Sequence, residues 1–303
     1  MKIQHLLFTL LAAGMMMTSC GDCDNTPEDS PQTANRNKNT PSASMPIEIT
    51  RLEFPHVKGD SNDPIIMHKA DGEVNFSLEW DNAKRAQRWT CYQMYASNRV
   101  IRWKRSNWKK IDPWFGDPFQ VDPMIQPSYQ STEEDHWNDG YDRGHICPSQ
   151  DRVNSRDANM QTFYYSNMQP QLNGFNSGVW EVLEEKIRGW ITQNSPQSDT
   201  LYVCKGGIID GTPGNDFTYN NHKLIVPGHF FCALLMKNAG GYKAIGFWFE
   251  HKNNKDKDLG KYAINVRELE RQTKLDFFCN LPDDVESHVE NLDQDRVKTA
   301  WGL

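Results

Sequence analysis

Short apolar runs separated by polar turns fill the second half of this chain and constrain its fold more than any other feature. Four of them have the length and the bounding residues of β-strands: 201–204, 224–226, 230–236 and 244–249. Two further segments, 179–190 and 266–274, have helical spacing instead. Because strands and helices do not alternate regularly, the sequence predicts an α+β fold with a mixed, largely antiparallel sheet and flanking helices.

The first half of the chain is less regular. Residues 51–80 mix short apolar runs with Gly, Asp and Asn, which is consistent with early strands or loops. Residues 89–103 alternate well enough to predict a hairpin with Ser97 and Asn98 at its turn. Prolines at positions 113, 118, 123 and 127 mark a long irregular connection. Such loops are unusual in compact domains unless they carry function.

The N-terminus has the pattern of a targeting segment. Lys2 precedes an apolar run over residues 6–17, which is followed by Thr18-Ser19-Cys20. This pattern predicts a lipoprotein signal peptide over residues 1–19, too short to span a bilayer. Small residues before Cys20 resemble a bacterial lipobox, so we expect an exported protein held at the membrane of the cell envelope by a lipid on Cys20. Plain secretion with an unmodified Cys20 is the alternative.

Residues 20–50 are the predicted flexible tether, and residues 51–303 the predicted folded domain. The stretch 21–44 is rich in Asn, Thr, Ser, Pro and Asp, and it cannot bury enough apolar surface to fold. The cysteines after Cys20 show no CxxC pair, so we expect no structural zinc site. One or two disulfides are compatible with export, and their pairing stays open.

The charge is uneven along the chain. A formal net charge of −7 argues against binding nucleic acid by bulk electrostatics. From Lys84 to Lys110, however, nine cations and five aromatic residues (Trp or Tyr) occur with no acid among them. Such a stretch suits phosphate contacts and stacking on bases. Equally, it fits a solvated strand pair whose cations cover the core.

One tetrapeptide, Asp142-Arg143-Gly144-His145, carries groups suited to cleaving phosphodiesters. Histidine can take a proton from water near neutral pH, and a guanidinium matches the geometry of phosphate. His145 is therefore the candidate base, and Arg143 or Arg188 is a candidate clamp. Asn176 offers a neutral amide oxygen to a hard metal ion that keeps most of its water.

Helix geometry separates the roles of the downstream residues. On a regular helix Glu184 lies roughly 12 Å beyond Asn176, so a contact through water with the same ion is the more reasonable expectation. Arg188 follows Glu184 by four residues, and the two can hold each other in place. Each piece also has a plain structural interpretation: a loop histidine, an N-cap at Asn176, a surface ion pair, and an Asp142 that anchors Arg143.

Taken together, these residues resemble the DNA/RNA non-specific endonucleases, whose active site is a ββα-metal finger. The resemblance covers about residues 80–286. It rests on the Asp-Arg-Gly-His motif followed by Pro148, then on a set of downstream and flanking matches: Asn167, Pro170-Gln171, Asn176, Trp180, Leu183-Glu184, residues 105–109, residues 268–273 and residues 281–285.

The resemblance implies cleavage of DNA and RNA with little sequence preference, dependent on Mg²⁺ or on Mn²⁺ in its place. It implies that His145 is the general base and that Asn176 is the one direct protein ligand of the metal. Four residues fall at supporting positions for phosphate, site geometry and the water around the metal: Arg143, Asn167, Glu184 and Arg188. Arg105 is a looser match for a substrate-binding position, because the basic segment is shifted by an inserted residue.

Three functions remain open at this level. The first is an exported nuclease acting on extracellular DNA and RNA. The second is a non-catalytic surface lipoprotein that binds glycans or polyanions. The third is a phosphodiesterase of the same fold with another substrate, or a site-specific nuclease. The presence of base, metal ligand and supporting glutamate together favours the enzyme.

Overall fold

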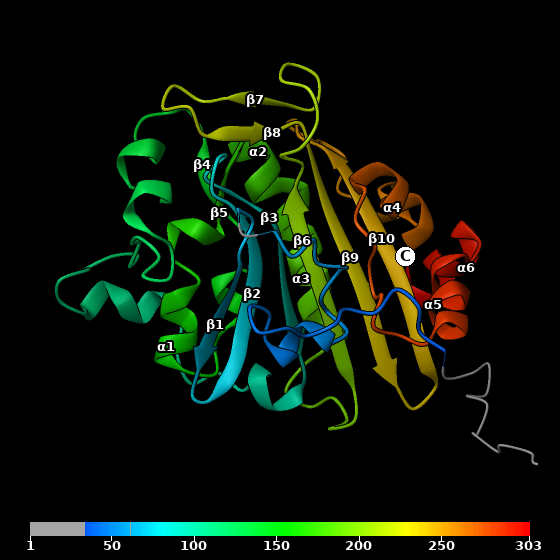
Figure 1. Ribbon diagram of the computed structural model, residues 1–303. Coiled ribbons are helices and arrows are strands. Elements are labelled where there is room, and N and C mark those ends of the chain that lie inside the picture. Colours follow the sequence, from blue (N-terminus) through cyan, green and yellow to red (C-terminus); the bar gives the residue numbers. More distant parts are fainter. Residues whose placement is uncertain (1–33, 61) are drawn as a thin grey trace, which may run out of the picture.

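A seven-stranded antiparallel sheet forms the centre of the computed structural model, which describes residues 34–60 and 62–303 (Figure 1). The strand order is β1-β2-β3-β6-β9-β10-β11. Every neighbouring pair in it is antiparallel. The bounds are β1 Ile65–Ala70, β2 Glu73–Asp81, β3 Ala86–Met94, β6 Thr200–Gly207, β9 His229–Asn238, β10 Gly241–Glu250 and β11 Ala263–Ile264. The α+β prediction is confirmed.

Both faces of this sheet are buried. Alternate residues of each strand point to opposite sides, so each face contributes side chains to its own apolar cluster. In β9, Phe230, Cys232 and Leu234 belong to one apolar cluster. Phe231, Ala233 and Leu235 belong to the other. Helices α3 (Glu181–Trp190) and α6 (Gln294–Trp301) cover the first face, while α4 (Val266–Thr273), α5 (Asp283–Glu290) and residues 49–57 cover the second.

Two small hairpins stand outside this sheet. Strands β4 (Asp142–His145) and β5 (Met168–Gln171) pair with each other, and β7 (Phe217–Tyr219) pairs with β8 (Ile225–Pro227). The short helix α1 (Arg156–Gln161) lies between β4 and β5 in sequence. Helix α2 (Asn173–Phe175) follows β5 and leads into a π-helical turn, Asn176–Trp180, before α3. The chain thus builds a β-β-α unit beside the sheet.

The strands predicted at 201–204, 230–236 and 244–249 are found within β6, β9 and β10. The helix predicted at 266–274 is found as α4. By contrast, the hairpin predicted over 89–103 is wrong, since β3 ends at Met94 and a 3₁₀ turn follows over Ala96–Arg99. The amide of Asn98 explains this end: it accepts from the Tyr95 backbone NH and donates to the Gln93 carbonyl.

The predicted helix over 179–190 is found with a different beginning. Asn176 has helical dihedral angles and its side chain caps nothing, and Ser177 donates to the Asn173 carbonyl. Gly178, with φ −107° and ψ −118°, kinks the chain inside the π-helical turn that precedes α3. Asn176 is therefore not the N-cap that the plain interpretation assumed, and the straight-helix distance to Glu184 does not apply.

The signal peptide over 1–19 and Cys20 lie outside the described residues. Of the predicted tether, residues 34–50 are described, and they pack on the domain. The Asn35 amide donates to the carbonyls of Cys279 and Leu281, and the Asn39 amide donates to the carbonyls of Ile49 and Pro55. This part of the tether belongs to the folded unit, because asparagine side chains satisfy loop carbonyls there.

Residues 95–141 form the long irregular connection that the prolines indicate, interrupted by short 3₁₀ turns. Five cysteines in the described part of the chain are free and buried: Cys91, Cys147, Cys204, Cys232 and Cys279. None of these five forms a disulfide. In residues 34–60 and 62–303, a helix with the length and apolarity needed to cross a bilayer is absent.

Candidate active site

The β4–β5 hairpin presents the Asp-Arg-Gly-His motif as one short strand. His145 pairs with Met168, and Gly144 pairs with Gln169. Glycine is required at position 144 because a Cβ there would lie 2.2 Å from Cδ of Gln171. The Gln169 side chain fastens the hairpin to the central sheet, donating to the Gln87 carbonyl and accepting from the Gly207 backbone NH.

His145 lies half-buried between aromatic rings. Phe163 meets its imidazole edge-on at a centroid distance of 5.1 Å, and Phe119 lies 6.0 Å away. Its Nε2 is buried and has no hydrogen-bond partner. Desolvation, with the positive charge of Arg105, lowers the pKa of His145 to about 3. The ring is thus neutral at neutral pH, as a proton acceptor must be.

Asn176 projects from the π-helical turn toward the same strand. Its Nδ2 donates to Oδ2 of Asp142 at 2.9 Å. An amide held by its nitrogen turns its carbonyl oxygen the other way, so Oδ1 is the end left to bind a cation. Asp142 also accepts from Asn173 at 3.0 Å. Asp142 therefore orients Asn176, whereas the plain interpretation had it anchoring Arg143.

Glu184 comes from α3 and is held by a lysine. Lys205, fully buried in β6, donates to Oε1 of Glu184 at 3.1 Å and lies 4.5 Å from the centre of the Trp180 ring. Desolvation raises the pKa of Glu184, and the charge of Lys205 opposes that shift. Arg188 is 4.0 Å from Oε2 of Glu184 and 3.4 Å from the buried carboxylate of Asp151. The predicted Glu184–Arg188 contact is thus part of a larger ion-pair network that also includes Lys205 and Asp151.

Two arginines reach the site from different segments. The guanidinium of Arg143 stacks over Phe119 at 4.0 Å. Arg105, on the 3₁₀ turn Arg105–Lys110, forms a bidentate ion pair with Asp117. Burial acts to raise the pKa of Asp117, but the hydrogen bond from Arg105 and the positive charges nearby together outweigh it and lower that pKa. Asp117 is thus ionised and neutralises much of the charge that Arg105 brings to the cleft.

Asn167 is buried beneath the site and does not reach the cleft. Its amide donates to the carbonyls of Cys147 and Thr162 and accepts from the Cys147 backbone NH. The side chain thereby fixes the chain just after His145, which is a positioning role. His251 has a similar role at the other end of the hairpin. It accepts from the Leu172 NH through Nε2, so Nδ1 carries the proton that it donates to the Pro227 carbonyl.

A cleft of about 420 Å³ brings most of these residues together. Of the predicted site residues, His145, Arg143, Arg105, Asn176 and Glu184 line it, whereas Asn167 and Arg188 lie behind its wall. The other lining residues are Asp117, Phe119, His136, Tyr141, Asp142, Pro148, Ser149, Gln150, Ser177 and Glu181. The cleft is therefore polar, and both the strands and the helix of the β-β-α unit contribute to its walls.

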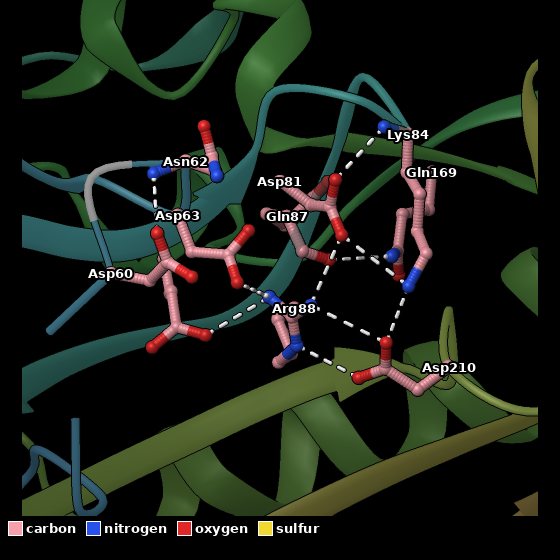
Figure 2. A network of polar contacts seen from close by, with 10 residues as sticks. Asp60, Asn62, Asp63, Asp81, Lys84, Gln87, Arg88, Gln169 and Asp210 are labelled. Atoms are coloured by element: carbon pink, nitrogen blue, oxygen red, sulfur yellow. Dashed lines mark hydrogen bonds and ion pairs between the residues drawn. The ribbon is translucent and has the colours of Figure 1, made fainter. Parts of the chain in front are cut away.

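The basic stretch over 84–110 does not form a cationic groove as a whole. Figure 2 shows Arg88 enclosed by carboxylates, among them those of Asp63, Asp81 and Asp210. Lys84 also pairs with Asp210, and Arg85 pairs with Asp135. These cations hold the fold together, and within this stretch only Arg105 lines the cleft.

Sequence reasoning missed Lys205 and Asp117. A signal for Lys205 was present, because a lysine in the middle of an apolar strand must find a buried partner. Asp117 carried no such signal, since it lies in the proline-rich connection and reaches Arg105 only through the fold.

The oxygen donors at the cleft fit a hard divalent ion such as Mg²⁺ or Mn²⁺. Asn176 supplies an amide oxygen, and Glu181 and Glu184 supply carboxylates on the same wall. Within the described residues no three His, Cys, Asp or Glu side chains are gathered as a metal-binding group. A metal held here would thus draw most of its ligands from water and substrate.

The site has the arrangement of the ββα-metal class. A pair of strands carries the half-buried histidine, and the helical segment that follows carries an asparagine and a glutamate at the same cleft. Comparison with known proteins agrees. The model of the family described as DNA/RNA non-specific endonuclease matches residues 68–284. The chain therefore belongs to the DNA/RNA non-specific endonuclease family, and the resemblance inferred from its sequence is confirmed.

Several relatives are similar over much of the chain. Nuclease EXOG, mitochondrial, of Xenopus laevis is 27% identical over 232 residues, 73% of this chain and 61% of that protein. Nuclease C1 of Cunninghamella echinulata var. echinulata is 31% identical over 172 residues, 54% of this chain and 67% of that protein. This chain thus spans less than two thirds of the EXOG relative.

A solved structure shows the same fold. The structure of the EndoG/EndoGI complex, which concerns EndoG inhibition, contains a chain that matches with a TM-score of 0.62 and 23% sequence identity. The match covers 78% of this chain and 93% of that chain.

Proposed function

We propose that the protein is a metal-dependent endonuclease that hydrolyses phosphodiester bonds of DNA and RNA with little sequence preference. The observation that carries this proposal is the arrangement of His145 and Asn176. They come from opposite halves of the β-β-α unit, line one cleft, and are tied together through Asp142. Membership of the endonuclease family supports the same reaction.

His145 would act as the general base on the attacking water. Its pKa, lowered to about 3, keeps the imidazole neutral and ready to accept a proton. Because its Nε2 is buried, Nδ1 is the ring nitrogen left to meet a water in the cleft. Phe119 and Phe163 shield the ring from bulk water and fix its orientation.

Arg143 would hold the scissile phosphate, since its guanidinium lies at the cleft and its ring contact with Phe119 leaves its edge available. Asn176 would hold Mg²⁺ or Mn²⁺, with Glu184 in support through water. When bound, such an ion neutralises charge on the phosphate and stabilises the departing oxygen. Lys205 and Arg188 keep the Glu184 carboxylate in place.

Low sequence preference follows from the kind of contact the cleft offers. Its arginines would contact phosphate, and its asparagine and carboxylates would bind a metal ion. Neither kind of contact carries sequence information. Acids pair with Lys84, Arg85 and Arg88, so these cations of the basic stretch are not free to bind a substrate.

Cleavage assays with plasmid DNA and with RNA test this function. The full-length chain should cleave both with Mg²⁺ or Mn²⁺ and neither with EDTA. His145→Ala should abolish cleavage, while His288→Ala, at an exposed position on α5, should not. Binding without cleavage by the unaltered chain would favour the non-catalytic binding protein instead.

We propose further that the protein is exported and anchored to a membrane of the cell envelope by a lipid on Cys20. The support is the sequence pattern of residues 1–20 alone. In the producing cell, the protein should partition with membranes and Cys20→Ser should release it. A Cys20→Ser protein that stays at the membrane would contradict lipidation at this residue.

A further inference from the structure

A second hollow of about 330 Å³ adjoins the active-site cleft. Trp137, Glu133 and Asn138 line this hollow alone, whereas His136 and Arg143 line both it and the cleft. Arg143 is therefore shared between the two spaces. A group bound in the hollow lies next to whatever Arg143 holds in the cleft.

Trp137 is unusual among the tryptophans of the described chain. It is 67% exposed, whereas Trp80, Trp89, Trp108 and Trp301 are almost completely buried. Every other tryptophan in the described residues is buried or half-buried. An indole left in water beside a functional cleft is typical of a surface that binds a planar or apolar partner.

The loop that carries Trp137 is held firmly by hydrogen bonds. The Trp137 NH donates to the Glu134 carbonyl at 3.2 Å, and the Trp137 carbonyl accepts from His222 at 2.8 Å. Asn220 donates to the Asp135 carbonyl and to the Asp139 carboxylate, at 2.9 and 2.8 Å. A loop fixed in this way loses little freedom when its indole binds a partner.

The remaining walls of the hollow complement a nucleotide. His136 is stacked on Tyr165 with ring centres 5.4 Å apart, and both nitrogens of its ring are buried without partners. Arg143 supplies a positive charge on the cleft side. The hollow thus offers an indole face for a base and a cation for a phosphate, with the side chains of Glu133 and Asn138 as further polar groups on its walls.

We propose that Trp137 and Arg143 form a nucleotide subsite that binds an unpaired base next to the scissile phosphate. The base stacks on Trp137 while Arg143 holds the phosphate attached to it. This inference rests on the proposed nuclease function and adds a preference to it: single strands bind more tightly than duplexes. In a duplex both faces of each base are covered by its neighbours, so the indole has no face to contact.

The test uses the full-length chain with His145→Ala, so that bound strands stay intact. Fluorescence anisotropy measures the Kd for a labelled 12-nucleotide single-stranded DNA and for the matching blunt duplex. Trp137→Ala should weaken single-strand binding roughly tenfold and duplex binding less than twofold, because stacking on one base is lost. Trp137→Phe should keep most of the affinity. Tyr219→Ala removes another exposed aromatic, outside both hollows, and should change neither Kd.

Salt dependence separates stacking from phosphate contacts. Trp137→Ala should leave the slope of log Kd against log salt unchanged, whereas Arg143→Gln should reduce it. Equal weakening of both DNA forms by Trp137→Ala, or none, would overturn the subsite. If the unaltered chain cleaves plasmid in that case, the nuclease function stands and only the subsite falls. A chain that neither cleaves nor binds any nucleic acid would remove both.

Discussion

The carboxylate of Asp142 accepts a hydrogen bond from the side-chain amide of Asn176 at 2.9 Å. The first residue of the Asp-Arg-Gly-His strand is thereby joined to the first residue of the π-helical turn. An asparagine amide has a donor end and an acceptor end, and only the acceptor end can bind a cation. Asp142 determines which end faces the cleft.

Removing this carboxylate should weaken metal binding. We expect Asp142→Ala to raise the Mg²⁺ concentration needed for half-maximal cleavage by roughly 10- to 100-fold, as loss of a ligand's partner commonly does. Asp142→Asn, which keeps an acceptor oxygen, should be affected less. A metal titration of the cleavage rate measures both. An unchanged Mg²⁺ requirement in Asp142→Ala would show that Asn176 is oriented by something else.

Gly144→Ala should lower cleavage activity, because the added methyl group clashes with one side chain. The new Cβ would lie 2.2 Å from Cδ of the buried Gln171. Because buried neighbours leave that side chain little room, we expect strand β4 to shift and to carry His145 with it. We expect a loss of cleavage of at least tenfold, since small displacements of catalytic groups are costly. Adding Gln171→Ala should restore part of the activity. Failure of the double variant to recover would place the strain elsewhere.

Lys205→Met should separate stability from catalysis. It leaves the Glu184 carboxylate without its buried partner, which we expect to lower the free energy of unfolding by about 2 kcal/mol, less than for a fully buried pair because Glu184 is partly exposed. Denaturant unfolding measures this change. Adding Glu184→Gln removes the unpaired charge and should restore stability without restoring cleavage. Recovery of cleavage in the double variant would exclude a role for Glu184.

At acid pH, the dependence of kcat/KM on pH should reflect the protonation of His145. With its pKa lowered to about 3, the base stays neutral well below its usual range, so kcat/KM should not fall between pH 7 and 5 through this residue. Arg105→Gln removes a charge that lowers this pKa and should move the acid limb to higher pH. An identical limb in Arg105→Gln would show that another group limits the rate.

Stability should fall with acidification for the same reason. In the unfolded chain His145 binds a proton below its ordinary pKa of about 6.5, whereas in the folded chain it stays neutral down to about 3. The unfolded state therefore binds more protons in this window, and the free energy of unfolding decreases as pH falls from about 6.5 towards 3. His145→Asn should show a shallower decrease in thermal unfolding over that window. Equal slopes in both proteins would contradict the lowered pKa.

Several parts of the site could be predicted because the sequence carries them locally. The Asp-Arg-Gly-His motif, Asn176 and Glu184 are separated by short stretches, and they meet at the cleft as the motif suggests. The basic stretch misled because its partners lie far away in sequence: Asp210 for Arg88 and Asp135 for Arg85. Such pairs depend on strand order, which the local pattern does not contain.

The kinked start of α3 escaped prediction for a different reason. A helical stripe fixes which residues face the core, but it does not distinguish an α-helical turn from a π-helical turn at Asn176–Trp180. The spacing over residues 179–190 therefore predicts the helix itself, but not the π-helical turn that orients Asn176.

The packing of residues 34–39 has a consequence for how the proposed nuclease would be presented to long nucleic acids if it is tethered. Ala34 and Asn35 form hydrogen bonds with the start of α5 and the loop before it. Helix α5 packs on one face of the sheet, whereas α3, which carries Glu184 of the cleft, packs on the other (Figure 1). Anything that holds the chain upstream of residue 34 therefore pulls from the back of the molecule. In a copy tethered there, the point of attachment and α3 would lie on opposite sides of the sheet, so a polymer many times the protein's own size could reach the cleft without passing between protein and surface.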